Sequence, residues 1–338
     1  MKTGIFSLLL LIPLLISCDD ESCDPNSTIT DNRISFELNF LEYSDNNYFI
    51  DDVYTDTSSN LNIFNSYYGK NPPTVNVQYS VKEIQVYKSS NTLSHNHIFA
   101  NAYIDLPARS HTVQYPDSLR DIGSFFPIPG ESAAERFKLL SSGDDYLFNS
   151  FTGYISFLKP LYELEIVAVA YSIESDSIYG EFFSDLIHNK DSVAVLKLVK
   201  PKNLIPEYKK AWKLKMRNLY KIIPYPGGIK NVDLDIYLKR ADGSETNSIN
   251  NKRLLELFGF DRFDERGNMT PDGKFDDLIG INYESKTAEI IFPVIEPFGE
   301  NIPPELSEYK YDWIYDTTKT YLSLPENYFV IKGRYSPR

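Results

Sequence analysis

Cysteine is scarce in this sequence, with only two residues among 338. Two cysteines cannot build a disulfide-rich scaffold, so a packed hydrophobic core must supply the stability. Basic residues are also in the minority, since 34 Lys and Arg stand against 47 Asp and Glu and give a formal net charge of −13. Nucleic-acid binding depends on clustered Lys and Arg. We therefore expect no nucleic-acid partner.

Sequence signatures of common catalytic mechanisms are missing as well. The chain contains no G-x-S-x-G elbow, Walker loop, H-E-x-x-H helix or G-x-G-x-x-G turn. It has four histidines, and His95 and His97 have a spacing that zinc can use. A zinc site needs a third ligand, and the sequence designates none. We expect a protein that is not an enzyme, with no catalytic residues, no cofactor and no metal site.

Two carboxylate pairs have the spacing of neighbours on one strand face. They are Glu163 with Glu165 and Asp233 with Asp235. A glycosidase holds two carboxylates about 5–10 Å apart across a cleft. One exposed strand face rarely provides such an arrangement, so we interpret both pairs as solvated surface.

The densest polar segment is 261–277, which reads DRFDERGNMTPDGKFDD. Oxygen-bearing side chains recur in it at four-residue intervals and could cradle calcium, namely Asp264, Asn268, Asp272 and Asp276. The segment does not match the EF-hand template, and Asp, Asn and Gly are also ordinary turn residues. The sequence leaves calcium binding and a plain turn both open.

Aromatic residues are abundant, with 25 Tyr and 21 Phe in a chain that is 42% hydrophobic. Such a composition indicates a folded body. Apolar residues alternate with polar ones or form short runs that predict strands at 34–40, 75–81, 98–106, 164–171, 193–199, 212–216, 232–238 and 289–292. Helical signals are few and lie at 131–140, 251–257 and 304–320.

The predicted fold is mainly β, an antiparallel β-sandwich-like domain with a few short helical insertions. We expect this domain to cover residues 34–338. The segment KPKNLIPE after residue 199 could separate two lobes, 34–200 and 201–338, as an alternative division.

Residues 1–17 have the layout of a secretory signal peptide, with Lys2 followed by an apolar run over 5–16. That run is shorter than the roughly 20 residues that span a bilayer as a helix. The sequence LISC, ending at Cys18, resembles the lipobox of bacterial lipoproteins. This resemblance implies cleavage before Cys18 and attachment of a diacylglycerol to its thiol. Residues 18–33 then form a flexible tether.

The acidic stretch directly after Cys18, DDES at 19–22, is similar to the export signal that sends lipoproteins of the Bacteroidetes to the cell surface. An ordinary solvated linker is the alternative interpretation. We expect an outer-membrane protein held by its lipid anchor, at the cell surface or on the periplasmic face. Cys23 lies in the tether and receives no structural role.

The order of segments in the second half resembles the repeated N-terminal-type domain of the SprA (Sov) family. These large outer-membrane translocons belong to the type IX secretion system, which serves protein export and gliding motility in Bacteroidetes. The most specific matches are PDGKFD at 271–276 and IFPVIEPFG at 291–299, with 212–220 and LLELFGFDR at 254–262 in the same order. The resemblance covers about 160–335 and extends more weakly back to about 75.

Physical reasoning assigns these motifs a folding role. A strand that ends at Phe292 and Pro293, followed by a Pro-Phe-Gly turn, is expected to place Phe292 and Phe298 on the core. Phe275 of the PDGKFD turn is expected to pack inward. Nothing in these motifs has catalytic character.

The resemblance implies the fold and an association with export machinery, and not translocation itself. The family proteins are far longer and contain a pore, whereas this chain reaches only Arg338. The expected function is therefore a non-enzymatic outer-membrane lipoprotein, an accessory or adaptor component of type IX secretion and gliding motility. The alternative is a surface glycan- or ligand-binding lipoprotein.

Overall fold

The computed structural model describes residues 32–338, with gaps at 59–60, 92–95, 122–125, 187–192 and 224–226. Within this range, Arg33–Arg338 form one compact unit. The signal peptide, Cys18 and nearly all of the tether lie outside the described residues. None of the helices in the described part of the chain has the length and apolar character that a membrane crossing needs.

The largest sheet has six strands in the order β10-β4-β5-β3-β8-β9, and it closes on itself because β10 also pairs with β8. All its pairings are antiparallel except that of β10 with β4. Both β8 and β10 are buried along their whole length, which explains their nearly continuous apolar sequences. The six strands are β3 (Val81–Ser89), β4 (His97–Tyr103), β5 (Ser132–Leu139), β8 (Val167–Ile173), β9 (Ile178–Tyr179) and β10 (Ala194–Lys200).

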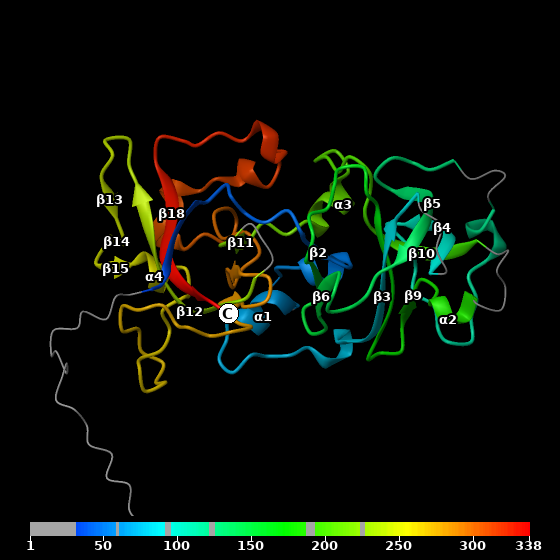
Figure 1. The fold of residues 1–338 in the computed structure, drawn as a ribbon, viewed down its shortest axis with the longest axis horizontal. Helices are drawn as coiled ribbons and strands as arrows, with labels where there is room; N and C mark the ends of the chain where they lie inside the picture. The colour runs from blue at the N-terminus through cyan, green and yellow to red at the C-terminus, as the bar shows by residue number, and fades with distance from the viewer. Residues whose placement is uncertain (1–31, 59–60, 92–95, 122–125, 187–192, 224–226) are drawn as a thin grey trace, which may run out of the picture. The chain divides into compact units, whose positions relative to one another are not determined.

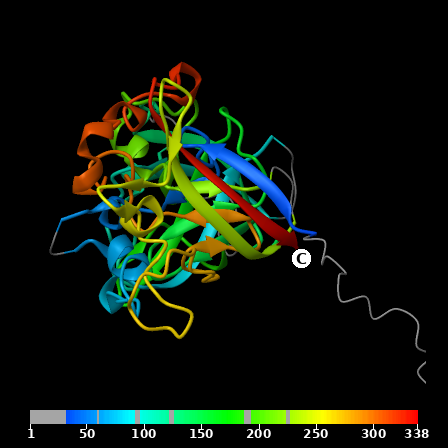
Figure 2. The same ribbon diagram turned by 90° about the vertical axis from the view of Figure 1, so that its left-hand side faces the viewer.

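A second sheet joins the beginning of the unit to its end. Its order is β1 (Ile34–Asn39), β18 (Tyr328–Pro337), β12 (Ile229–Lys239) and β13 (Glu245–Thr246), all antiparallel. Phe36, Gly333 and Leu234 lie in one row across three of these strands. Figure 2 shows β1 running beside β18. The alternating burial of β12 matches its alternating sequence, with one face on the core.

Three small sheets complete the β structure of the described residues. They consist of β2 (Asn47–Phe49), β7 (Tyr154–Phe157) and β6 (Tyr146–Asn149); β11 (Leu219–Lys221), β17 (Glu289–Ile291) and β16 (Tyr283–Glu284); and β14 (Ser248–Ile249) with β15 (Lys252–Arg253). In Figure 1, β2, β6 and β11 lie between the two large sheets.

The helices are short connections between strands. The α-helices are α1 (Ile63–Tyr68), α2 (Phe183–Leu186), α3 (Lys209–Leu214) and α4 (Leu254–Leu257). The 3-10 helices are η1 (Asp52–Thr55), η2 (Val77–Tyr79), η3 (Asp117–Leu119), η4 (Pro304–Tyr309), η5 (Asp312–Ile314) and η6 (Lys319–Tyr321). The mainly β fold with antiparallel sheets and short helical insertions is thus confirmed.

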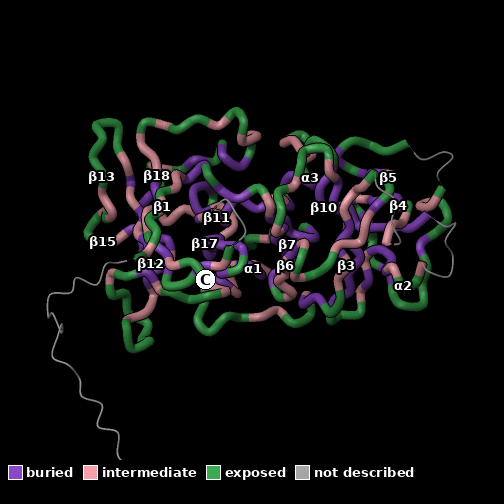
Figure 3. The backbone as a smooth tube through the Cα atoms, in the orientation of Figure 1, coloured by how far each residue is buried: buried purple, intermediate pink, exposed green. Residues whose placement is uncertain are grey.

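Two large hydrophobic clusters form the interior of the unit. The first fills the six-stranded sheet and its surroundings, from Tyr48 to Leu219, and also includes Ile291. The second is strongly aromatic and combines Phe40 of the N-terminal segment with residues from Tyr220 to Tyr335. Figure 3 shows the buried positions concentrated along the strands, with exposed positions over the loops.

The folding roles expected for the two most specific motifs are confirmed. Phe292 and Phe298 are fully buried in the second cluster, and their ring centroids lie 5.3 Å apart. Phe275 also packs inward, with its ring centroid 5.7 Å from that of Phe260. These segments therefore build the aromatic core.

Several secondary-structure predictions were wrong. Residues 131–140 form strand β5 in place of a helix, because seven pairs with β4 outweigh the local helical preference of Ala133 and Ala134. Of the strand predicted at 212–216, the first three residues end helix α3, with Ala211, Trp212 and Leu214 buried together, and only Lys215 forms a β-bridge, with Tyr48. A short apolar run fits either structure by pattern alone.

The remaining differences concern element ends. The strand expected at 75–81 begins only at Val81, after a 3-10 turn. The helix expected at 304–320 is broken into the three 3-10 turns η4, η5 and η6. In the segment 251–257, only Leu254–Leu257 are helical, because the two residues before them pair in β15.

Candidate functional site

Two of the residues singled out in the sequence, Cys18 and His95, lie outside the described residues. His97 lies at the start of β4. In the ranges that the structure describes, no group of three or more His, Cys, Asp or Glu side chains could hold a metal ion.

The acidic segment 261–277 uses its carboxylates to hold turns. Asp264 accepts hydrogen bonds from the backbone N–H groups of Arg266 and Asn268 and from the Asn268 amide, and these bonds lower its pKa. Asp272 accepts from the backbone of Lys274. Asp264, Asp272 and Asp276 line an open pocket of about 420 Å³, whereas Asn268 does not line it.

Asp261 has a role in this segment that the sequence analysis did not single out. It is buried, and its two carboxylate oxygens accept hydrogen bonds at 2.9 Å from the backbone N–H groups of Asp272 and Gly273. This fixes the Pro-Asp-Gly turn against the core. A buried carboxylate that receives two backbone donors is a structural clamp.

The two predicted carboxylate pairs lie in different settings. Glu165 is an ion-pair partner of Lys88 at 2.5 Å, whereas Glu163 lines the pocket of the candidate site. Asp235 pairs with Arg253 at 2.5 Å and Asp233 approaches Arg33 at 3.7 Å. Both aspartates line an open pocket of about 620 Å³ formed by strands β1, β12 and β18 together with Arg253 and the turn at 273–275.

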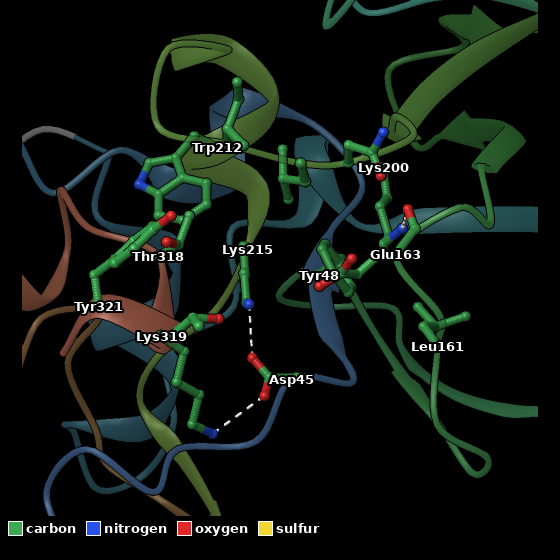
Figure 4. A pocket seen from close by; sticks show the side chains of 14 residues that line it. Asp45, Tyr48, Leu161, Glu163, Lys200, Trp212, Lys215, Thr318, Lys319 and Tyr321 are labelled. Carbon is green, nitrogen blue, oxygen red and sulfur yellow. Dashed lines mark hydrogen bonds and ion pairs between the residues drawn. The ribbon is translucent and has the colours of Figure 1, made fainter.

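Our candidate site is a pocket of about 700 Å³, which is larger than the two open pockets described above. Four segments far apart in the sequence line it: the connection from β1 to β2, residues 161–163, the stretch 200–215 and the 3-10 turn η6 with Thr318 before it. Figure 4 shows Trp212 and Tyr321 on one side of Lys215, and Tyr48, Glu163 and Lys200 on the other.

Asp45 and two lysines form the charged centre of the pocket (Figure 4). Oδ1 of Asp45 lies 2.6 Å from Nζ of Lys215, and Oδ2 lies 3.1 Å from Nζ of Lys319. Nζ of Lys319 also donates to the Tyr43 carbonyl at 2.6 Å and lies 4.6 Å from the centroid of the Tyr43 ring. The charged centre therefore ties the β1–β2 connection to α3 and to η6.

Burial and charge act in opposite directions on these groups. Burial raises the pKa of the Asp45 carboxyl, but Lys215 and Lys319 outweigh burial and hold that pKa below its ordinary value. Burial lowers the pKa of Lys215, against the opposing effect of Asp45. The centre thus places the Asp45 carboxyl group between two lysine side chains.

Lys200 closes one side of the pocket as a structural clamp. Its Nζ donates to the carbonyls of Tyr162, Glu163 and Glu165 at 3.0, 3.2 and 2.5 Å. The Pro201 carbonyl lies 3.5 Å from the same Nζ, so four acceptors surround the three donors of the ammonium group. Burial lowers the pKa of Lys200 to about 8. The clamp fixes the segment that carries Glu163.

Trp212 is held rigidly in the pocket wall. Its indole N–H donates to the Tyr315 carbonyl at 2.5 Å, and the guanidinium of Arg217 lies 4.2 Å from the centroid of the indole ring. Tyr321 contrasts with it, because 83% of Tyr321 is exposed at the rim. One aromatic wall is thus fixed and the other is open to solvent.

Most of this site was missed by the sequence analysis. The segment KPKNLIPE was considered only as a separator of lobes, yet Lys200, Asn203, Leu204 and Ile205 line the pocket. The two lysines of the WKLKM segment carried the available signal, because Lys215 lines the pocket with a side chain that is only 14% exposed.

The chain was compared with known proteins. No protein-family model matches it, and no curated protein matches it either.

Proposed function

We propose that this chain is a non-enzymatic outer-membrane lipoprotein that acts as an accessory or adaptor component of type IX secretion and gliding motility. Two features of the sequence support the proposal. The lipobox-like segment that ends at Cys18 supports a lipid anchor, and the ordered motifs of the second half support kinship with the SprA family.

One structural observation carries the proposal furthest. The two motifs with the most specific resemblance contribute Phe275, Phe292 and Phe298 to one aromatic cluster. Residues that determine a core are those that a shared fold must keep, whereas turns on the surface vary freely. The resemblance therefore rests on the residues that specify the fold.

Affinity purification tests the adaptor role. The full-length chain, carrying a C-terminal tag, is purified from detergent-solubilised outer membranes, with an unrelated tagged outer-membrane lipoprotein as the control. We expect type IX translocon subunits to be enriched with this chain and absent from the control. Repeated absence of those subunits contradicts the proposal.

The anchor and its membrane face are tested separately. The variant Cys18→Ser removes the thiol that acylation requires, so we expect it to leave the membrane fraction. Protease shaving of intact cells then distinguishes the two faces of the outer membrane, since a surface protein is digested and a periplasmic protein is protected. A Cys18→Ser variant that stays membrane-bound contradicts the lipid anchor.

The second candidate function is a surface glycan- or ligand-binding lipoprotein. It is favoured by the pocket around Asp45, Lys215 and Trp212, whose volume of about 700 Å³ lies in the range of small-molecule sites. Binding to a glycan array tests it, and a screen without any binding counts against it.

A further inference from the structure

The charged centre of the candidate site offers hydrogen-bond donors and acceptors together. Within the described residues, Lys215 is paired with Asp45, and Lys319 donates to Asp45 and to the Tyr43 carbonyl. An ammonium group has three donors and a carboxylate has about four acceptor sites. Both lysines therefore keep hydrogen-bond donors, and Asp45 keeps acceptor sites, that a ligand can use.

The carboxylate in this centre offsets part of the attraction that the two lysines exert on an acceptor-only anion. A phosphate or carboxylate ligand that reaches Lys215 and Lys319 also meets Asp45, whose side chain is 47% exposed and which carries the same sign of charge. Like charges at short range repel. A hydroxyl group avoids that repulsion, because it donates to the carboxylate and accepts from an ammonium at the same time.

The remaining walls suit a ligand with an apolar face. Tyr321 offers an exposed aromatic ring at the rim, Trp212 and Tyr48 line the pocket with little exposed surface, and aliphatic surface comes from Leu204 and Ile205. A pyranose ring has such a face, since its C–H groups lie on one side and its hydroxyl groups at the edge. Aromatic rings are suitable platforms for a face of this kind.

The polar groups are also held in place before any ligand arrives. Asp45 is fixed by two lysines, Trp212 by its bond to Tyr315, and the segment of Glu163 by Lys200. Groups that are already ordered lose little conformational entropy on binding. A pocket with fixed donors, acceptors and aromatic walls is therefore suited to specific recognition of a hydroxyl-rich molecule.

We propose that this pocket binds a neutral saccharide, with hydroxyl groups on Asp45, Lys215 and Lys319 and a sugar ring against Trp212 and Tyr321. The inference rests on the second candidate function and names its ligand class. It makes no use of the adaptor role, so the two can fail independently.

An array of neutral and acidic oligosaccharides tests the proposal, using the full-length lipoprotein in detergent. We expect binding to at least one neutral oligosaccharide, which is then titrated against the protein by tryptophan fluorescence. The variants Lys215→Met and Tyr321→Ala are expected to weaken that binding about tenfold or more, equivalent to about 1.4 kcal/mol.

Matched variants control for non-specific effects. Lys310→Met removes a lysine that pairs with Asp312 away from the pocket lining, and Phe126→Ala removes an aromatic side chain as exposed as Tyr321, at 83%. Both are expected to bind like the unmodified protein. If Lys215→Met does not fold, Tyr321→Ala still decides the question, because its side chain lies at the rim.

Three results overturn the inference: no neutral oligosaccharide binds, only acidic ones bind, or the pocket variants bind as well as the controls. Saccharide binding by a protein that enriches no translocon subunit leaves the inference intact and removes the adaptor role. Enrichment of translocon subunits without saccharide binding supports the adaptor role and overturns the saccharide inference.

Discussion

Asn47 donates a hydrogen bond from Nδ2 to Oε1 of Glu289 over 2.9 Å, and both side chains are buried. The two residues are 242 positions apart in the sequence and belong to strands β2 and β17. Burial raises the pKa of the Glu289 carboxyl, although its polar neighbours Ser44, Asn47 and Thr287 and the charge of Lys221 oppose the rise. The fold therefore favours the protonated form of Glu289.

A carboxyl group with a raised pKa stabilises the fold below its ordinary pKa, and this contribution is lost as pH rises through the raised value. We expect Glu289→Gln to increase the free energy of unfolding by about 1–2 kcal/mol near pH 8, because an uncharged amide replaces a buried charge. The increase should disappear near pH 4, close to the ordinary carboxyl pKa. Urea denaturation at both pH values measures this increase in the free energy of unfolding.

Glu284→Gln, on the neighbouring strand β16, is the control. A gain in stability of Glu289→Gln that does not change with pH contradicts the prediction.

Gly333→Ala is expected to destabilise the β1-β18-β12 sheet. A Cβ atom at this position would lie 2.7 Å from Cζ of Phe36 and 2.8 Å from Cβ of Leu234, and it would also meet the Asp233 carbonyl. Overpacking of this kind costs about 1–3 kcal/mol. Thermal and urea unfolding measure the loss. The control is Gly227→Ala, whose Cβ would meet its nearest atom at 3.5 Å, and an equal effect in both variants counts against the prediction.

Phe298→Ala is expected to remove a central member of the aromatic core. The Phe298 ring lies 5.3 Å from that of Phe292 and 5.2 Å from that of Phe329, measured between centroids. Truncation of a buried phenylalanine to alanine costs about 3–5 kcal/mol. Phe126→Ala, at a position 83% exposed, should change the free energy of unfolding by less than about 0.5 kcal/mol. Similar losses in the two variants are incompatible with the core position of Phe298.

Lys200→Met is expected to lower stability by about 1–3 kcal/mol near neutral pH, because three carbonyl groups lose their common donor. Burial lowers the pKa of Lys200 to about 8 from an ordinary value of 10.5. Between these values the unfolded chain binds more protons, so the unmodified protein gains stability relative to Lys200→Met as pH rises. Urea denaturation across that interval measures the gain.

Lys202→Met is the control for Lys200, since Lys202 is an exposed lysine with one ion-pair partner, Glu135. Its stability is expected to follow that of the unmodified protein across the same pH interval. A constant difference between Lys200→Met and the unmodified protein from about pH 8 upward contradicts the assigned pKa shift.

Local sequence patterns predicted the strands that are most strongly apolar or most regularly alternating. The last five residues of the run LEIVAVAY, 167–171, lie in β8, and the run VDLDIYL lies within β12. The inward positions of Phe275, Phe292 and Phe298 were also predictable, because the turn residues next to them indicated that these side chains point toward the core.

The pocket was not predictable by the same means. Asp45, Lys200, Lys215 and Lys319 come together only through contacts between distant segments, and periodicity carries no information on such distances. The strand β5 shows the same limit, because its two neighbours in the sheet, β3 and β4, override the local preference of its own residues.

The pairing of β1 with β18 has a consequence for the order of events during synthesis. The strand that is made first completes its sheet only when the last residues of the unit arrive. Contacts of such sequence separation form slowly, since a long loop must close before they do. A growing chain therefore stays without its finished sheet until residues 328–337 have been synthesised.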